Sequence, residues 1–122
     1  MKFELSAAPG LNTFTGYGEG YVLVNGQRFA ESVIVLAGRI EPWSVPGVDA
    51  LTEAHLAQLA DLGAEVVLLG TGATLRFPHP RLLQGLVRAG IGVEVMDTQA
   101  ACRTFNILVA EERKVAAALL FS

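Results

Sequence analysis

Apolar residues along the chain gather into short continuous runs that predict the strands of a buried sheet. Three such runs lie at residues 32–37, 65–69 and 91–96. Runs of this length, bounded by glycine and polar residues, are typical of strands that are covered on both faces. A fourth run, residues 115–120, could form a helix because of its alanines. Its place after the charged turn at residues 111–114 favours a strand.

The first third of the chain predicts a β-hairpin. Residues 21–24 and 27–29 are β-prone, and Asn25-Gly26 stands between them. Asn-Gly is the strongest short hairpin signal, because a type I′ turn needs two residues that tolerate a positive φ. A glycine-rich segment, residues 14–20, precedes the hairpin and is also expected to be extended.

Helices are expected between the later strands. One is predicted over residues 52–62, a second over residues 81–89, and a third from Asp97 or Thr98 to about residue 109. The ends of the first two are marked by residues that start or stop helices, which are Thr52, Gly63, Pro80 and Gly90. The alternation of strand and helix predicts an α/β fold with parallel strands joined by right-handed crossovers.

The composition is that of one domain, so residues 1–122 are interpreted as a single unit. The chain is 52% hydrophobic and 17% charged, with a formal net charge of −3. No cluster of Lys and Arg provides the basic surface of nucleic-acid binding, and no apolar run approaches the ~20 residues that span a bilayer. The first residues show no secretory-signal or transit-peptide pattern, so we expect a cytoplasmic protein. The high apolar content is also compatible with a homo-oligomer.

Gly70-Thr71-Gly72 follows a predicted strand, as the first glycines of a dinucleotide-binding motif do. Asp97 ends the next strand, where a ribose-binding acid would be sought. The third glycine of the motif is missing, because position 75 is Leu, and about seven residues separate the glycines from the next helix. A phosphate therefore could not lie on the N-terminus of that helix. We interpret the glycines as a tight turn, whose amides could still bind another small anion.

The sequence shows no catalytic or metal-binding motif. Cys102 is the only cysteine, and neither His55 nor His79 is linked to it by sequence. A buried, unreactive thiol is the favoured interpretation, because a nucleophilic thiolate needs a nearby base or cation. The two histidines have no metal-ligand spacing, so neither a metal nor a cofactor is predicted.

Two further features have alternative interpretations. On the third helix, Gln99, Arg103 and Asn106 share one face, which could line a pocket or meet solvent; solvent is favoured. Trp43 lies in a loop with two prolines, where it could contact a ligand or partner or could plug the end of the sheet.

In open α/β sheets, ligands bind outside the carboxyl ends of the strands. Here those ends carry the loops that begin near residues 38, 70 and 96, and we expect these loops to converge on one rim. The candidate ligand-binding residues of this rim are Trp43, Gly70, Thr71, Gly72, Arg76, Asp97, Thr98 and Arg103.

The C-terminal half also resembles a known family of small domains. The residues that carry the resemblance are Gly92 to Thr98, Ala101 to Leu108 and Glu111 to Leu119, with Trp43, Gly70 to Gly72 and Phe77-Pro78 upstream. The family includes a mitochondrial respiratory complex I assembly factor and the adipogenesis-associated protein, and it has stand-alone bacterial and archaeal members of uncharacterised function.

The resemblance implies a three-layer α/β domain with a mixed central sheet of mostly parallel strands, whose last strand runs antiparallel to the rest. It implies no catalytic activity, although it is consistent with a pocket at the strand ends. Family members often have Glu-Gly-Arg where this chain has Glu111-Glu112-Arg113 or its one-residue shift, so the resemblance does not determine the exact turn there.

Two functions follow as hypotheses. The first is a non-enzymatic binding or interaction module that could assist the assembly of a protein complex, with a protein partner or a small ligand held at the rim. The alternative is an enzyme of unrecognised class, in which Arg76 or Arg103 fixes an anion and Asp97 acts as acid or base. The sequence shows no nucleophile–base pair, which favours the binding module.

Overall fold

The computed structural model of the chain describes residues 10–121. Its central element is a five-stranded sheet in the order β5-β4-β8-β6-β7. These strands are β4 (Val33–Leu36), β5 (Arg39–Pro42), β6 (Val66–Thr71), β7 (Gly92–Met96) and β8 (Val115–Leu120). β6 and β8 form the middle of the sheet, and most of their side chains are buried, as the continuous apolar runs predicted.

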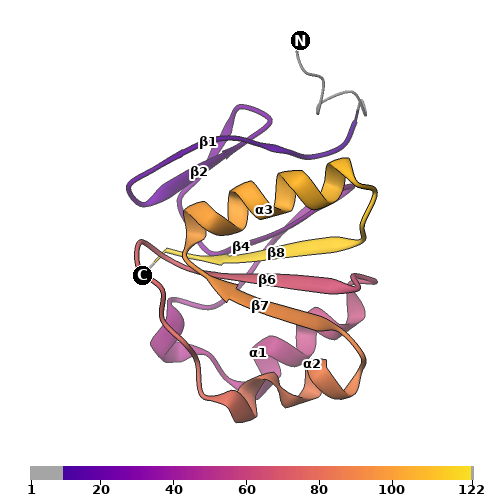
Figure 1. Cartoon of the computed structure of the whole chain (residues 1–122). Helices are drawn as coiled ribbons and strands as arrows, with labels where there is room; N and C mark the ends of the chain where they lie inside the picture. Colours follow the sequence, from indigo (N-terminus) through magenta and orange to yellow (C-terminus); the bar gives the residue numbers. More distant parts are fainter. Residues whose placement is uncertain (1–9, 122) are drawn as a thin grey trace.

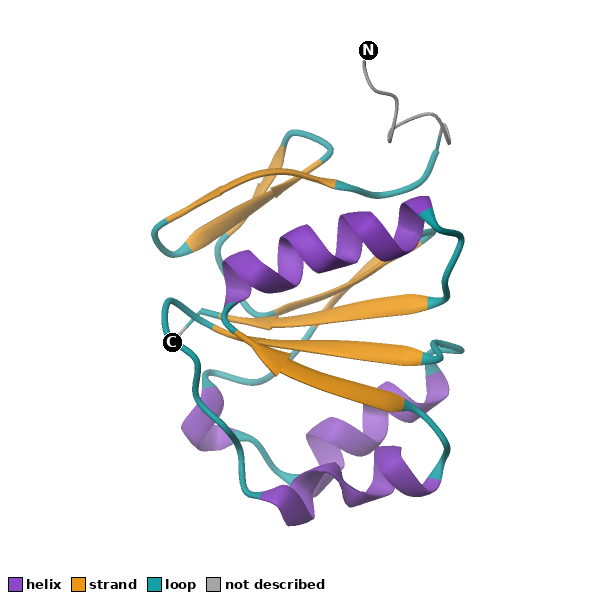
Figure 2. Cartoon of the chain, in the orientation of Figure 1, coloured by secondary structure: helices purple, strands orange, loops and turns teal. Residues whose placement is uncertain are grey.

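Helices cover both faces of this sheet, so the predicted three-layer α/β fold is confirmed (Figures 1 and 2). Helix α3 (Thr98–Ala110) packs on one face, against β6 and β8. Helices α1 (Glu53–Ala57) and α2 (Gln84–Arg88) lie on the other face. Three short 3₁₀ turns accompany them: η2 (Val48–Ala50), η3 (Gln58–Asp61) and η4 (Pro80–Leu83). Two buried apolar clusters result, one on each side of the sheet.

The sheet is mixed, as predicted, but the reversed strand is not the one expected. β8 runs parallel to β6, and β6 runs parallel to β7, so the prediction of an antiparallel last strand was wrong. β4 is the strand that reverses, because it pairs antiparallel with both β8 and β5. A tight hairpin fixes the direction of β5 against β4: Leu36 pairs with Arg39, and only two residues connect the strands, which permits antiparallel pairing alone.

A second, three-stranded antiparallel sheet packs on the α3 side. It consists of β1 (Phe14–Gly18), β2 (Tyr21–Val24) and β3 (Gln27–Phe29). Asn25 and Gly26 adopt φ values of 51° and 83°, which confirms the hairpin turn expected from Asn-Gly. The Asn106 side-chain amide of α3 bonds both backbone groups of Phe14 at 2.8 Å and ties β1 to the helix.

The helix ends follow the predicted signals, and α3 has the predicted length, although α1 and α2 are shorter than the helices expected there. Thr52 forms a capping box with His55 at the start of α1, and Gly63 and Gly90 take left-handed φ values just past their helical segments. Each of the first two predicted helices is divided into an α-helical turn and a 3₁₀ turn, α1 with η3 and η4 with α2, whereas α3 is one continuous helix. In the first, the fully buried Leu56 and Leu59 are three residues apart, the period of a 3₁₀ helix.

Helix α3 ends in a Schellman motif without the usual glycine. The amide of Arg113 donates to the carbonyl of Leu108 and that of Glu112 donates to Val109, both at 2.9 Å. This geometry puts Glu112 at a φ of 63°, where a side chain is unfavourable. The chain keeps the turn that glycine would form and accepts backbone strain at this one position.

We therefore expect Glu112→Gly to raise the free energy of unfolding by about 0.5–1 kcal/mol, because glycine removes the left-handed strain. Glu111→Gly is the control: Glu111 has a φ of −90°, so glycine there only adds unfolded-state entropy and should lower stability. Urea unfolding of the two variants measures both effects. Equal losses in the two variants would show that Glu112 is not strained.

Candidate functional site

The buried hydroxyl of Thr98 holds the carboxyl ends of the central strands together. Thr98 begins α3 and is only 6% exposed. Its Oγ accepts a hydrogen bond from the amide of Gly72 and donates one to the carbonyl of Leu120, both at 2.9 Å. The Thr98 amide in turn donates to the carbonyl of Gly72 at 2.9 Å. We call these three hydrogen bonds the Thr98 lock, since they join the ends of β6 and β8 to the start of α3.

The lock requires glycine at two positions of β6 and its loop. A Cβ on Gly70 would lie 2.8 Å from the Leu119 side chain, closer than real Cβ contacts, and 3.1 Å from Thr98 Oγ, which is tighter than most of them. Gly72 has a φ of +96°, which other residues rarely adopt. The tight turn predicted here therefore has two causes: the start of α3 approaches Gly70 closely, and Gly72 takes a left-handed backbone conformation.

Thr71 organises the loop that leaves β6. Its hydroxyl donates to the carbonyl of Thr74 at 2.8 Å and accepts from the amide of Arg76 at 3.0 Å. The Thr71 residue is 2% exposed. The Thr71 hydroxyl thus forms its hydrogen bonds within the protein. Together with the Thr98 lock, it occupies the amides of Gly72, Arg76 and Thr98, to which an anion at this turn would have to bind.

Asp97 caps α3, as one of the two sequence alternatives predicted. Its carboxylate Oδ1 accepts from the amide of Ala100 at 2.8 Å. Beside it lies a cleft of about 470 Å³ between the β1–β2 turn and the start of α3, which we call the hairpin cleft. It is lined by Tyr17, Gly18, Glu19, Gly20, Tyr21, Gly72, Ala73, Asp97, Thr98, Gln99 and Phe121.

The residues of the β1–β2 turn that line this cleft were not among those predicted for the rim. Gly18 lies beneath the ring of Tyr21, since a Cβ on Gly18 would be 2.4 Å from that ring. The Arg28 guanidinium lies 4.2 Å from the centre of the same ring. The glycine-rich spacing of residues 16–20, with a tyrosine on either side of Gly18, was the available signal.

Arg103 lies where α3 contacts the β1–β2 hairpin. Its guanidinium donates to the Tyr17 hydroxyl at 3.1 Å. Asn106, on the same helix face, bonds Phe14. The polar face of α3 that we expected to meet solvent therefore packs in part on β1, although Gln99 and Arg103 are exposed.

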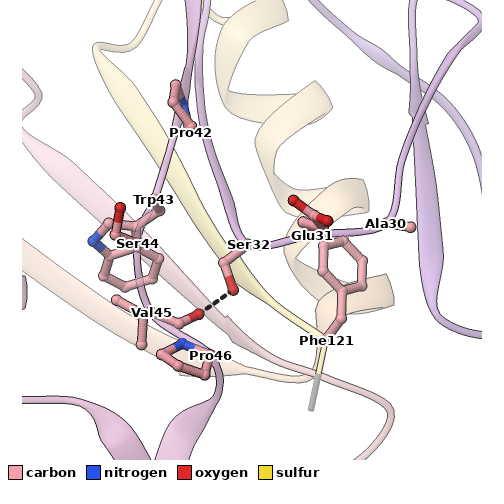
Figure 3. A pocket seen from close by; sticks show the side chains of 9 residues that line it. All are labelled: Ala30, Glu31, Ser32, Pro42, Trp43, Ser44, Val45, Pro46 and Phe121. Carbon is pink, nitrogen blue, oxygen red and sulfur yellow. Dashed lines mark hydrogen bonds between the residues drawn. The ribbon is translucent and has the colours of Figure 1, made fainter.

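Arg76 and Trp43 lie apart from the hairpin cleft. The Arg76 guanidinium forms an ion pair with the exposed carboxylate of Asp49. Trp43 is 3% exposed and packs in the cluster beneath the sheet. It borders a separate pocket of about 540 Å³, in which Figure 3 shows Phe121 on the opposite side from Trp43. Phe121 lines both hollows, so they are neighbours at the same edge of the sheet.

Cys102 is buried in the core, and the two histidines accept hydrogen bonds at the starts of helical segments. Cys102 is 1% exposed, and burial raises the pKa of its thiol to about 12; the charge of Arg103 opposes this rise and that of Asp97 adds to it. His55 belongs to the α1 capping box, and His79 accepts from the Arg81 amide at the start of η4. Within residues 10–121 no three His, Cys, Asp or Glu side chains are grouped so as to hold a metal ion.

Gly70→Ala tests whether the close approach at Gly70 supports the fold. The added methyl group must displace Leu119 or Thr98, so we expect a loss of about 1–3 kcal/mol in the free energy of unfolding. Gly85→Ala is the matched control, because nothing lies within 4 Å of a Cβ there and the residue is helical. It should be neutral or slightly stabilising. Equal effects in urea unfolding would contradict the packing argument.

Cys102 should make the fold sensitive to alkali. Because the folded-state pKa of about 12 lies above the ordinary thiol pKa of 9.0, the unfolded chain loses its thiol proton first as the pH rises. The contribution is intact below pH 9.0 and declines between the two values. We expect the stability of the wild type to fall more steeply than that of Cys102→Ala between about pH 9 and about pH 12. Parallel curves would mean that the folded thiol titrates normally.

The whole fold has close counterparts among known proteins. A family model described as "Protein of unknown function (DUF498/DUF598)" matches residues 14–120. A crystal structure of a Bordetella parapertussis protein is 44% identical in sequence and superposes with a TM-score of 0.88, covering 94% of this chain and 99% of that one.

Two curated relatives carry the same descriptive name, NADH dehydrogenase [ubiquinone] 1 alpha subcomplex assembly factor 3. The Danio rerio protein is 35% identical over 122 residues, which cover 98% of this chain and 68% of the relative. The Mus musculus protein is 36% identical over 97 residues, which cover 78% of this chain and 52% of the relative. The similarity thus leaves a third to a half of these longer proteins unmatched.

Proposed function

The chain belongs to the DUF498/DUF598 family of proteins of unknown function, and we propose that it is a non-enzymatic protein-binding module that assists the assembly of a multisubunit complex. The names of the Danio rerio and Mus musculus relatives support this role. Transfer of the role is part of the proposal, because those relatives are longer than the matched region. We further propose a cytoplasmic location; no helix within residues 10–121 is long and apolar enough to cross a bilayer.

The observation that carries the proposal is an exposed apolar pair on an ordered loop. Phe77 is 73% exposed and Leu75 is 49% exposed, although both are large apolar side chains. The loop between them and β6 is held by the Thr71 hydroxyl and by the ion pair of Arg76 with Asp49. Aromatic side chains on ordered surfaces are typical anchors of protein interfaces, since little entropy is lost when they bind.

The polar residues considered for an enzyme have other engagements that support a binding role. Asp97 caps α3, Arg76 pairs with Asp49, and Arg103 bonds Tyr17. These contacts give each of the three side chains a structural role that does not depend on a reaction.

The hairpin cleft is the part of the predicted rim that we retain as a site for a partner side chain or small ligand. Gly72, Asp97 and Thr98 line it directly, whereas Gly70 and Thr71 support it from beneath. Arg103 contacts its rim through Tyr17. Trp43 lines the adjacent pocket, which Phe121 shares with the cleft.

Deletion and complementation in the native host test the proposed role. Deletion of the gene should lower the amount of assembled NADH dehydrogenase complex on native gels, and the wild-type gene should restore it. The double variant Leu75→Ser, Phe77→Ser should fail to restore it, because the proposed contact surface is lost.

Val87→Ser is the matched control for that double variant. Val87 is also an exposed apolar residue, at 64%, but it lies on α2 rather than on the loop. It should restore the complex fully. A normal amount of complex in the deletion strain would overturn the assembly role.

A further inference from the structure

We propose that the outer edge of β7 receives an extended segment of the partner protein as a sixth strand of the central sheet, with a Lys or Arg of that segment opposite Glu94. This inference rests on the proposed protein-binding function and names the mode of contact. Strand addition to an open sheet edge is a recurrent way of recognising extended segments, with main-chain hydrogen bonds for affinity and side-chain pockets for specificity.

β7 is paired on one side only. It forms five register pairs with β6, from Val66 with Gly92 to Gly70 with Met96, and no other strand of the described chain pairs with it. Figure 2 shows it as the last strand of the sheet. An edge strand presents a row of unpaired N–H and C=O groups to its outer side, which is a template for another strand.

The opposite edge of the sheet, β5, has features that hinder strand addition and that β7 lacks. β5 ends in Pro42, which has no N–H to donate, and its Arg39 and Glu41 form an exposed ion pair at 2.6 Å. Proline and charged side chains on an edge strand both hinder strand addition. β7 has the sequence Gly-Val-Glu-Val-Met, with one charge and no proline.

The side chains of β7 indicate which strand would fit beside it. Val93 and Val95 point to the side of α1 and α2, where they are only half-buried against the core beneath the sheet. An adjoining strand with apolar residues at the matching positions would remove their remaining surface from water. Glu94, between them, is exposed on the other face and forms no ion pair within residues 10–121.

Glu94 argues against a second copy of this chain as the occupant. Antiparallel pairing of two β7 strands centred on Glu94 would place two carboxylates directly opposite each other, which is destabilising. A segment with Lys or Arg at that position gains a favourable cross-strand pair instead. The expected partner sequence therefore alternates apolar, basic and apolar residues.

Peptide titration followed by ¹⁵N chemical shifts tests the proposal on the full chain. The probe is the capped peptide Thr-Val-Lys-Val-Thr, with Thr-Val-Glu-Val-Thr as its charge control and a backbone N-methylated Thr-Val-Lys-Val-Thr as its hydrogen-bond control. The Lys peptide should shift the amides of residues 92–96 and bind about three- to tenfold more tightly than the Glu peptide. The N-methylated peptide should lose binding, because it lacks the N–H groups that pair with the edge.

Glu94→Lys should reverse the preference for the two peptides, and its own ¹⁵N spectrum verifies that it folds. Equal binding of both peptides, shifts elsewhere on the surface, or no shift at β7 would each overturn strand addition. A wild-type dimer in light scattering with protected β7 amides would also overturn it, in favour of self-pairing. If these tests fail while gene deletion still depletes the complex, the protein-binding function stands and this edge is not its contact.

Discussion

One buried hydroxyl group, that of Thr98, determines how the ends of β6 and β8 meet the start of α3. Thr98 Oγ is satisfied both as an acceptor, from Gly72, and as a donor, to Leu120. A buried hydroxyl with no partners would cost on the order of 1–3 kcal/mol, so the three segments that it joins are held in one arrangement. That arrangement fixes where α3 begins. The position of α3 in turn places the β1–β2 hairpin, which Asn106 and Arg103 attach to the helix, and so defines the hairpin cleft.

The Thr98 lock also changes how the residues at the strand ends are interpreted. Gly70, Thr71 and Gly72 resemble a ligand-binding loop in sequence, yet their backbone and hydroxyl groups are engaged with Thr98, Thr74 and Arg76. What the molecule offers a partner is of another kind. It presents two apolar side chains on an ordered loop and the unpaired edge of β7. Both are suited to contact with a protein, where apolar burial and main-chain hydrogen bonds supply the affinity.

Features that depend on local chemistry could be predicted from the sequence. The Asn25-Gly26 turn, the Thr52 cap and the glycine stops of the helices all follow from the backbone angles that these residues permit. The direction of β4 could not be predicted in the same way, because it depends on pairing with β8, where only tertiary packing brings Val33 opposite Leu119. The hairpin side of the cleft was missed for a related reason: Tyr17 and Arg103 are 86 residues apart, and only tertiary packing brings them together.

Amide hydrogen exchange at Gly72 and Thr98 in the free protein tests the central claim most directly. If the strand ends are sealed by the Thr98 lock, both amides should exchange slowly, with protection comparable to that of the buried strands β6 and β8. Fast exchange at these two amides, while β6 and β8 remain protected, would contradict the account. It would mean that the turn is open in solution and that its backbone groups are available to a ligand after all.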